Sequence, residues 1–251
     1  AAADALADTP LGQMPWEDWQ RWSVEFALDA SAPTPQIEPW LQGRTVAVAS
    51  DAAFSFIYPA NLDCLQAMGA KLVFFSPLAA ERLPACDAVW LPGGYPELHA
   101  HKLAANTGLQ ADLQAHVQAG KAVWAECGGM LALGHSIHTA QGEALPMWGI
   151  LPGTASMQPR LAGLGMQQCV LHGGLLRGHT FHYSRFDSAA AEVARTSRAG
   201  QTVQADKGEA LYQHGSICAS YFHAWFPSHP RAIAALLGAE AVQWADVAAT
   251  A

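Results

Sequence analysis

Between residues 45 and 125 the sequence alternates short, continuously apolar runs with segments of helical spacing, and this alternation restricts the fold more than any other feature. The apolar runs are T-V-A-V-A-S at 45–50, K-L-V-F-F-S at 71–76, A-V-W-L at 88–91 and K-A-V-W-A at 121–125. Helical patterns occupy 60–69 and about 106–119, where Asn106 is a candidate N-cap and Gly120 a candidate stop. Strands that are apolar on both faces are typical of a parallel sheet covered by helices on both sides. We therefore expect an α/β domain with a doubly wound, mostly parallel sheet.

The second half of the chain has a different rhythm. Short strand candidates are separated by Gly-rich turns such as H-G-G at 172–174, and the helical signal is weak until 228–237. The strand candidates lie at 166–171, 177–183, 201–205, 209–213 and 216–222. This pattern predicts an antiparallel extension attached to the parallel sheet.

The first 43 residues differ from the rest. Trp16, Trp19 and Trp22 recur at a three-residue step, which places them along one side of a helix. That side could be a docking surface for another domain or could pack on the body of this chain, and the sequence favours neither. Pro33, Pro35 and Pro39 follow, a run typical of a linker or an extended arm.

The charge balance excludes several classes of partner. Among 251 residues, 21 are acidic and 13 basic, for a formal charge of -8. No basic field is available to attract nucleic acid or an anionic membrane surface. No stretch approaches the roughly 18 consecutive apolar residues of a membrane span, and the Ala-rich start lacks the basic segment of a signal peptide. We expect neither nucleic acid nor a membrane as a partner.

The five cysteines form no framework. Their number is odd, their spacings are wide and no C-x-x-C pair occurs, so neither a zinc cluster nor a set of disulfides is predicted. A reducing compartment, the cytoplasm, is the simplest interpretation. Four of them lie in apolar surroundings and are expected to be buried and inert. These four are Cys64, Cys86, Cys169 and Cys218.

Cys127 has a different local sequence. It follows the run K-A-V-W-A and precedes G-G-M-L-A-L-G, a helix-like segment that opens with two glycines. A cysteine on a sharp strand-to-helix turn is exposed at the carboxyl end of a parallel sheet, where open α/β folds bind their ligands. The helix N-terminus lowers the pKa of the thiol and supplies N–H groups for an oxyanion. The sequence thus predicts a nucleophile on an elbow, with an inert buried thiol as the competing interpretation.

A second glycine turn ends a neighbouring strand. The segment V-W-L-P-G-G-Y-P-E at 89–97 contains Gly93 and Gly94, whose backbone can offer a further N–H to the same pocket. Donors from Gly94 and Gly128 would together form an oxyanion hole for a tetrahedral intermediate. Taken alone, the P-G-G sequence indicates only a turn.

A thiol nucleophile needs a base, and histidine is the usual one. The chain has 11 histidines, and spacing does not choose among them. His223 follows the apolar run S-I-C-A-S-Y-F and would lie at a sheet edge, whereas His179 and His182 could equally be core or pocket residues. Neither H-x-x-x-H nor H-E-x-x-H occurs, so no metal site is predicted.

Six segments in order resemble one known family, the glutamine amidotransferase domain of cobyrinate or hydrogenobyrinate a,c-diamide synthases, enzymes of cobalamin biosynthesis. The match runs from about Arg44 to Leu237, and A-F-S-F-x-Y-P-x-N-L is its most specific part. The segments are D-A-A-F-S-F-I-Y-P-A-N-L-D at 51–63, F-F-S-P-L at 74–78, L-P-G-G-Y-P-E at 91–97, A-E-C-G-G at 125–129, G-H-T-F-H-Y-S at 178–184 and A-S-Y-F-H at 219–223.

The resemblance implies a class I, triad-type amidotransferase acting on L-glutamine. Cys127 corresponds to the nucleophile that forms a glutamyl thioester, and His223 to its base. Gly93, Gly94 and Gly128 correspond to the loops that bind the oxyanion and glutamine. Many triad enzymes carry a glutamate two residues after the histidine, where this chain has Trp225, so the third member is unassigned.

The resemblance also implies a larger enzyme. Such synthases pair this domain with an ATP- and Mg²⁺-dependent domain that binds the corrinoid, and the chain has no G-x-x-x-x-G-K-[ST] loop. We expect an arm at 1–43, the amidotransferase domain at 44–238 and a tail at 239–251, with no cofactor in this chain. It could be a C-terminal fragment or a separate subunit, and the acceptor could be cobyrinate or hydrogenobyrinate. The alternatives are a cysteine hydrolase of small amides and a catalytically silent binding module.

Overall fold

The computed structural model describes residues 1–25, 36–201 and 208–244. The chain divides into two compact units, Ala1–Gln36 and Ile37–Ala251. The first contains α1 (Ala2–Ala7) and α2 (Trp16–Trp22), and α2 carries the three tryptophans on the predicted helix. Pro33 and Pro35, most of the strand candidate at 201–205 and the end of the expected tail lie outside the described residues.

The second unit alternates strands and helices as predicted up to residue 133. These elements are β1 (Thr45–Ala49), α3 (Pro59–Ala67), β2 (Lys71–Phe75), η1 (Pro77–Ala79), β3 (Ala88–Leu91), η2 (Pro96–His99), α4 (Ala100–Ala105), α5 (Thr107–Gln118), β4 (Ala122–Glu126) and α6 (Gly128–Leu133). The predicted cap is confirmed: Asn106 precedes α5, and its side chain accepts a hydrogen bond from Leu109 N. Gly120 follows α5 with a positive φ of 71°, which favours glycine at a helix end.

The rest of the chain is mostly strand. Its elements are β5 (Ser136–His138), β6 (Ala144–Pro146), β7 (Gly153–Met157), β8 (Gly163–Leu171), β9 (Gly174–His182), β10 (Ser184–Ser188), β11 (Ala191–Arg195), β12 (Ser197–Arg198), β13 (Ala210–His214), β14 (Ile217–Ser220), β15 (His223–Ala224), η3 (Phe226–Ser228) and α7 (Pro230–Leu236). The predicted strand at 216–222 ends two residues early, because the chain leaves the central sheet after Ser220 and re-pairs as β15.

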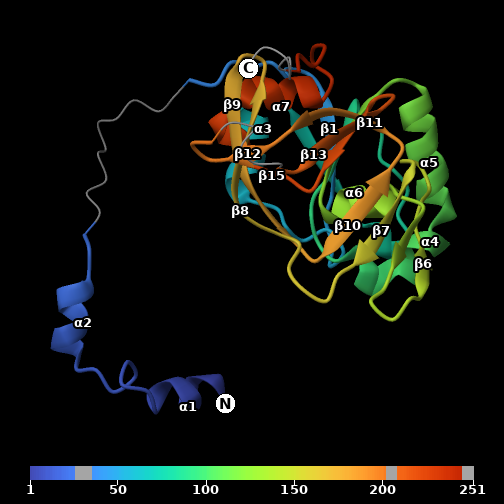
Figure 1. The fold of residues 1–251 in the computed structure, drawn as a ribbon. Coiled ribbons are helices and arrows are strands. Elements are labelled where there is room, and N and C mark those ends of the chain that lie inside the picture. Colours follow the sequence, from blue (N-terminus) through green and yellow to red (C-terminus); the bar gives the residue numbers. More distant parts are fainter. Residues whose placement is uncertain (26–35, 202–207, 245–251) are drawn as a thin grey trace. The chain divides into compact units, whose positions relative to one another are not determined.

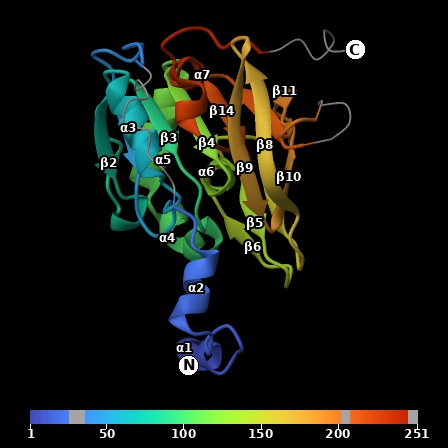
Figure 2. The same cartoon turned by 90° about the vertical axis from the view of Figure 1, so that its left-hand side faces the viewer.

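The central sheet contains the four strands predicted to be parallel, and β14, which was expected in the antiparallel extension, joins them by pairing in parallel with β4. Its seven strands run in the order β11-β13-β14-β4-β3-β1-β2, and the pairs from β14 to β2 are parallel. β13 and β11 extend the sheet with antiparallel pairing. Two further four-stranded sheets, β10-β7-β5-β6 and β12-β8-β9-β15, make up the rest of this half. Their strand pairs are antiparallel except for β5 and β7, which pair in parallel. Figure 2 shows the β8–β9 hairpin on the opposite side of the domain from β2.

Helices cover both faces of the central sheet because its strands are apolar on both faces. On β1, Val46 and Val48 belong to one buried cluster, while Ala47 and Ala49 belong to another. The first cluster includes α3 and α7, and the second includes α4, α5 and α6. Figure 1 shows α3 and α7 on one side of the sheet and α4 and α5 on the other. The expected doubly wound α/β fold is confirmed.

No helix within the three described ranges is long and apolar enough to cross a membrane.

Candidate active site

Cys127 lies on a strained turn between β4 and α6. Its backbone adopts φ 44° and ψ -107°, a conformation that side chains other than glycine rarely take. Such strain costs on the order of 1–3 kcal/mol and is found mainly at functional sites. Cys127 N donates to Ser220 O at 2.7 Å, which fixes the turn against the end of β14. The turn is the elbow that the sequence predicted.

The two glycine turns touch each other. A Cβ atom on Gly128 would lie 2.8 Å from both the backbone N and the backbone O of Gly94. A Cβ atom on Gly94 would lie 2.1 Å from the carbonyl oxygen of Ala53. Both distances are too short for a real side chain, so glycine is required for this approach. The peptide groups of Gly94 and Gly128 therefore lie side by side next to Cys127.

His223 is held against the same glycine turn. A Cβ atom on Gly93 would lie 2.3 Å from the imidazole Cε1 of His223. In this turn Gly93 therefore contacts the imidazole of His223, and Gly94 contacts Gly128 at the start of α6. Because Gly128 is the residue after Cys127, the same glycine turn connects Cys127 and His223, which are far apart in the sequence.

Asn61 fixes the strand that carries His223. This buried side chain donates from Nδ2 to Ala224 O at 2.9 Å and accepts at Oδ1 from Phe226 N at 2.9 Å. These two hydrogen bonds hold the residues on either side of Trp225. Trp225 is 43% exposed, and its ring lies edge-on to that of Tyr58. The tryptophan at the position of the usual glutamate thus points toward solvent.

Aromatic rings enclose the imidazole of His223. Its ring stacks on His179, with centroids 4.9 Å apart and planes 12° apart, and the Phe56 centroid lies at 5.8 Å. His179 Nε2 lies 2.6 Å from the hydroxyl of Tyr58. Among the described residues, neither ring nitrogen of His223 has a hydrogen-bond partner. Burial, and then the neighbouring His179 and His182, lower the pKa of His223 to about 3. The resting imidazole is neutral and can accept a proton.

The thiol of Cys127 is also neutral at rest. Burial raises its pKa to about 12, the Gly128 N–H lowers it, and the acidic side chains of Glu97, Glu126 and Glu209 raise it when they are ionised. The sequence predicted that the turn lowers the pKa of this thiol. The Gly128 N–H does lower it, but burial raises it by more. The thiol of Cys127 and the imidazole of His223 are therefore both uncharged in the free chain.

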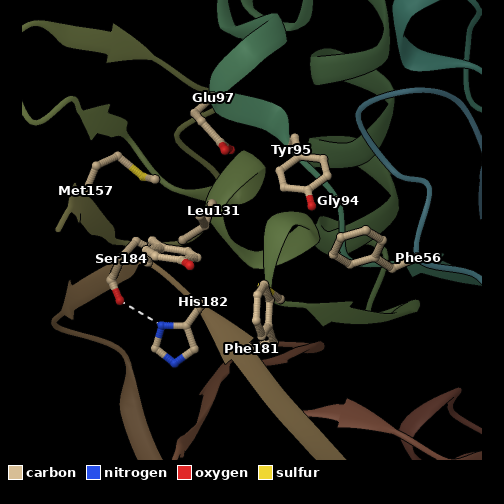
Figure 3. Close-up of a pocket in the computed structure, with 11 residues that line it drawn as sticks. Phe56, Gly94, Tyr95, Glu97, Leu131, Met157, Phe181, His182 and Ser184 are labelled. Atoms are coloured by element: carbon tan, nitrogen blue, oxygen red, sulfur yellow. Dashed lines mark hydrogen bonds between the residues drawn. The ribbon is translucent and has the colours of Figure 1, made fainter. Parts of the chain in front are cut away.

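Cys127 lies in the wall of a small pocket. Figure 3 shows this pocket, with Tyr95 and Phe181 among the labelled side chains around it. Its volume is about 90 Å³. A buried water needs roughly 10–15 Å³ by the same kind of measure, so the pocket admits a small molecule and not a polypeptide. It is lined by Phe56, Gly94, Tyr95, Glu97, Cys127, Leu131, Met157, Phe181, His182, Tyr183 and Ser184.

Glu126 is a residue that sequence reasoning passed over. It is 1% exposed and lies directly before Cys127, where a charged residue ends an otherwise apolar run. Its Oε1 accepts hydrogen bonds from Trp124 Nε1 at 2.8 Å and from Ala224 N at 3.2 Å. Oε2 has no hydrogen-bond partner in the described part of the chain. Burial raises the pKa of Glu126 to about 8, and the carboxyl group links the strand of Cys127 to the strand of His223.

This carboxyl group should make folding stability fall as pH rises. Glu126 keeps its proton up to about pH 8 in the folded chain, whereas an unfolded glutamate loses it near pH ~4.3. The unfolded chain thus binds fewer protons between those values, and the free energy of unfolding falls by up to about 1.4 kcal/mol per pH unit. His223 acts in the opposite direction only below pH ~6.5, so Glu126 dominates between about pH 6.5 and 8.

Urea denaturation of Glu126→Gln at pH 6.5 and 8 tests this expectation. The amide preserves an acceptor for Ala224 N and has no proton to lose, so most of the slope over this range should disappear. Glu143→Gln, at an exposed position, is the matched control and should retain the slope. An unchanged slope in Glu126→Gln would contradict a protonated, buried carboxyl group.

In the described ranges, no cluster of three or more His, Cys, Asp or Glu side chains is arranged to hold a metal ion.

Comparison with known proteins agrees with this geometry. Residues 45–231 match the model of the CobB/CobQ-like glutamine amidotransferase domain. Over 238 residues the chain is 47% identical to the hydrogenobyrinate a,c-diamide synthase of Stutzerimonas stutzeri, covering 94% of this chain and 52% of that protein. Over 239 residues it is 45% identical to the cobyrinate a,c-diamide synthase of Herminiimonas arsenicoxydans, covering 94% of this chain and 53% of that one.

A solved structure described as a glutamine amidotransferase shares the fold, with a TM-score of 0.53 and 22% identity over 77% of this chain and 97% of that one. The chain spans about half the length of the curated relatives it matches. Its extensive match to the domain model and its identity to these synthases show the family. The chain belongs to the CobB/CobQ-like glutamine amidotransferase domain family.

Proposed function

We propose that this chain is the glutaminase half of an ATP-dependent a,c-diamide synthase of cobalamin biosynthesis. Cobyrinate and hydrogenobyrinate a,c-diamide synthases are the relatives of which it covers about half. The observation that carries the proposal is the strained Cys127 turn, packed through two glycine turns against the buried imidazole of His223. The family model adds that glutamine is the amide donor of such a domain.

In the first step the Cys127 thiol gives its proton to the neutral imidazole of His223, and the sulfur attacks the side-chain amide carbon of glutamine. The N–H groups of Gly94 and Gly128 stabilise the resulting oxyanion. When the intermediate collapses, the carbon–nitrogen bond breaks and the proton on His223 passes to the departing nitrogen. Ammonia leaves, and a γ-glutamyl thioester remains on Cys127.

In the second step a water molecule gives a proton to His223 and attacks the thioester carbonyl. The same two N–H groups receive the oxyanion, and the carbon–sulfur bond breaks. The proton returns to the sulfur, so that glutamate is released and the thiol is restored. Both steps need an imidazole that is neutral before it receives a proton, and the lowered pKa of His223 supports that state.

The other half of the enzyme would use the ammonia. It would bind ATP, Mg²⁺ and the corrin acceptor, activate a side-chain carboxylate by phosphorylation and let ammonia displace the phosphate. This chain would then need no cofactor of its own. All five cysteines are free, which supports a reducing location, the cytoplasm.

The test is whether glutamine hydrolysis depends on the partner reaction. Glutaminase activity of the chain, assembled with its synthase half, should rise when ATP, Mg²⁺ and the corrin acceptor are added. A glutamine-analogue electrophile such as diazo-oxo-norleucine should label Cys127, as read by mass spectrometry. A hydrolase of small amides would show activity without such coupling, and no label on Cys127 would rule out the proposal.

A further inference from the structure

The outward face of the β8–β9 hairpin is apolar. Strand pairing sets Leu164 opposite Phe181 and Met166 opposite His179. Leu164 is 60% exposed, Met166 65% and Phe181 40%. We call this surface the hairpin face, made of Leu164, Met166, Gln168, Val170, Leu175, Arg177, His179 and Phe181.

This composition is unusual for a solvent-facing side. An antiparallel sheet with one face packed on a core normally carries polar residues on the other face. The buried face of this hairpin does pack on the core, through Cys169, Leu171 and Leu176. Arg177 is the single permanently charged side chain among the eight residues of the hairpin face. Gln168 pairs with Arg177 between two apolar ends, one with Leu164, Met166 and Phe181 and the other with Val170 and Leu175. Isolated exposed apolar side chains are common, but adjoining ones such as these mark an interaction site.

The hairpin face is continuous with the active site. Phe181 also lines the pocket of Cys127, and His179 stacks on His223. Between His179, His223 and Trp225 lies a hollow of about 360 Å³. The hollow is lined by Tyr58, Met166, Arg177, Gly178, His179, His223, Ala224 and Trp225. Because Met166, Arg177 and His179 of the hairpin face line this hollow, a partner bound on that face would cover the hollow beside His223.

We propose that the hairpin face is the docking surface for the synthase half of the enzyme, with the hollow over His223 enclosed between the two halves. This inference rests on the proposed function. The curated relatives are about twice as long as the region this chain matches, so in them a second half of similar size accompanies the domain. That half must meet the site to receive ammonia before it escapes, and the hairpin face is an apolar, almost uncharged surface in contact with the general base.

Photo-crosslinking in the assembled enzyme tests where the synthase half docks. A benzophenone amino acid in place of Leu164 or of Leu175 should capture a peptide of the synthase half on irradiation. The two positions lie toward opposite ends of the hairpin, so together they test its whole length. The matched control is the same replacement of Phe74, which is 52% exposed on the edge strand β2 at the far end of the central sheet, and it should capture none. Capture of only a second copy of this chain, or of residues 16–22, would overturn the proposal.

A negative charge placed on the hairpin face should weaken docking of the synthase half, and this tests whether the docked contact serves ammonia transfer. In the assembled enzyme Leu164→Glu should raise the number of glutamines hydrolysed per amide formed by about tenfold, equivalent to ~1.4 kcal/mol of lost coupling. Ammonia-supported amidation and the glutaminase activity of the chain should stay as in the parent enzyme, and Phe74→Glu should change nothing. Normal coupling in Leu164→Glu would refute the docking surface alone. Absence of coupling in the parent enzyme would refute the proposed function itself.

Discussion

Replacing Cys127 with alanine is expected to lower glutamine-dependent amidation by roughly 10⁴-fold or more, since loss of the nucleophile leaves only binding and oxyanion stabilisation. Amidation supported by free ammonia should be unchanged, because it bypasses the thioester. The two activities, measured in the assembled enzyme with glutamine and with ammonium chloride, separate damage to the glutaminase site from general damage to the protein.

Cys218→Ala is the matched control for this variant. Cys127 and Cys218 are each 5% exposed, and burial raises the pKa of both thiols to about 12. Only Cys127 has the positive φ of the elbow and lines the pocket. Cys218→Ala should therefore keep full activity with glutamine. If Cys127→Ala still supported glutamine-dependent amidation, the chain would be a binding module without catalytic function.

Replacing His223 with asparagine is expected to lower kcat for glutamine hydrolysis by roughly 10²–10⁴-fold, the usual contribution of a general acid–base residue. The KM for glutamine should change little, because His223 does not line the 90 Å³ pocket that opens on Cys127. Gly93→Ala should also lower kcat, because the added Cβ would lie 2.3 Å from the imidazole Cε1 of His223 and displace the ring. Steady-state kinetics with glutamine as the varied substrate distinguishes kcat from KM.

The pH profile provides the control for His223. Its pKa is held at about 3 by burial and by two neighbouring histidines, whereas an exposed histidine titrates near pH ~6.5. The kcat/KM of the parent enzyme should therefore not fall between about pH 7 and pH 5 through loss of the base. His101→Asn, at an exposed position, should leave both kcat and the profile unchanged. An acid limb centred near pH ~6.5 that disappears in His101→Asn would point to a different base.

Local patterns predicted the central fold well. The run A-V-W-L coincides with β3, Asn106 caps α5, and Gly120 follows its end with a positive φ. These features depend on neighbours within a few residues: apolar side chains fill both faces of a buried strand, and an amide side chain satisfies the first free N–H groups of a helix. For the second half, the sequence predicted short, mainly antiparallel strands but not the sheets to which they belong. Its division into two small sheets depends on which strands pair.

Pairing between distant segments decided the active site. Spacing alone could not choose among the histidines, and only the resemblance pointed to His223. The structure brings it to the site because β14 lies next to β4 while β15 pairs with β9. Glu126 was missed for the same reason: its contact with Ala224 joins residues 98 positions apart. The stack of His223 on His179 likewise joins two strands of another sheet.

The sequence by itself determined the parallel sheet, the elbow at Cys127 and the glycine turns, because each is encoded by residues adjacent along the chain. Only the tertiary structure decided that Gly93 must lack a side chain, that Trp225 faces solvent and that a buried carboxyl group lies beside Cys127. It also decided that thiol and imidazole are both uncharged at rest, since the pKa of each depends on burial by segments far apart in the chain.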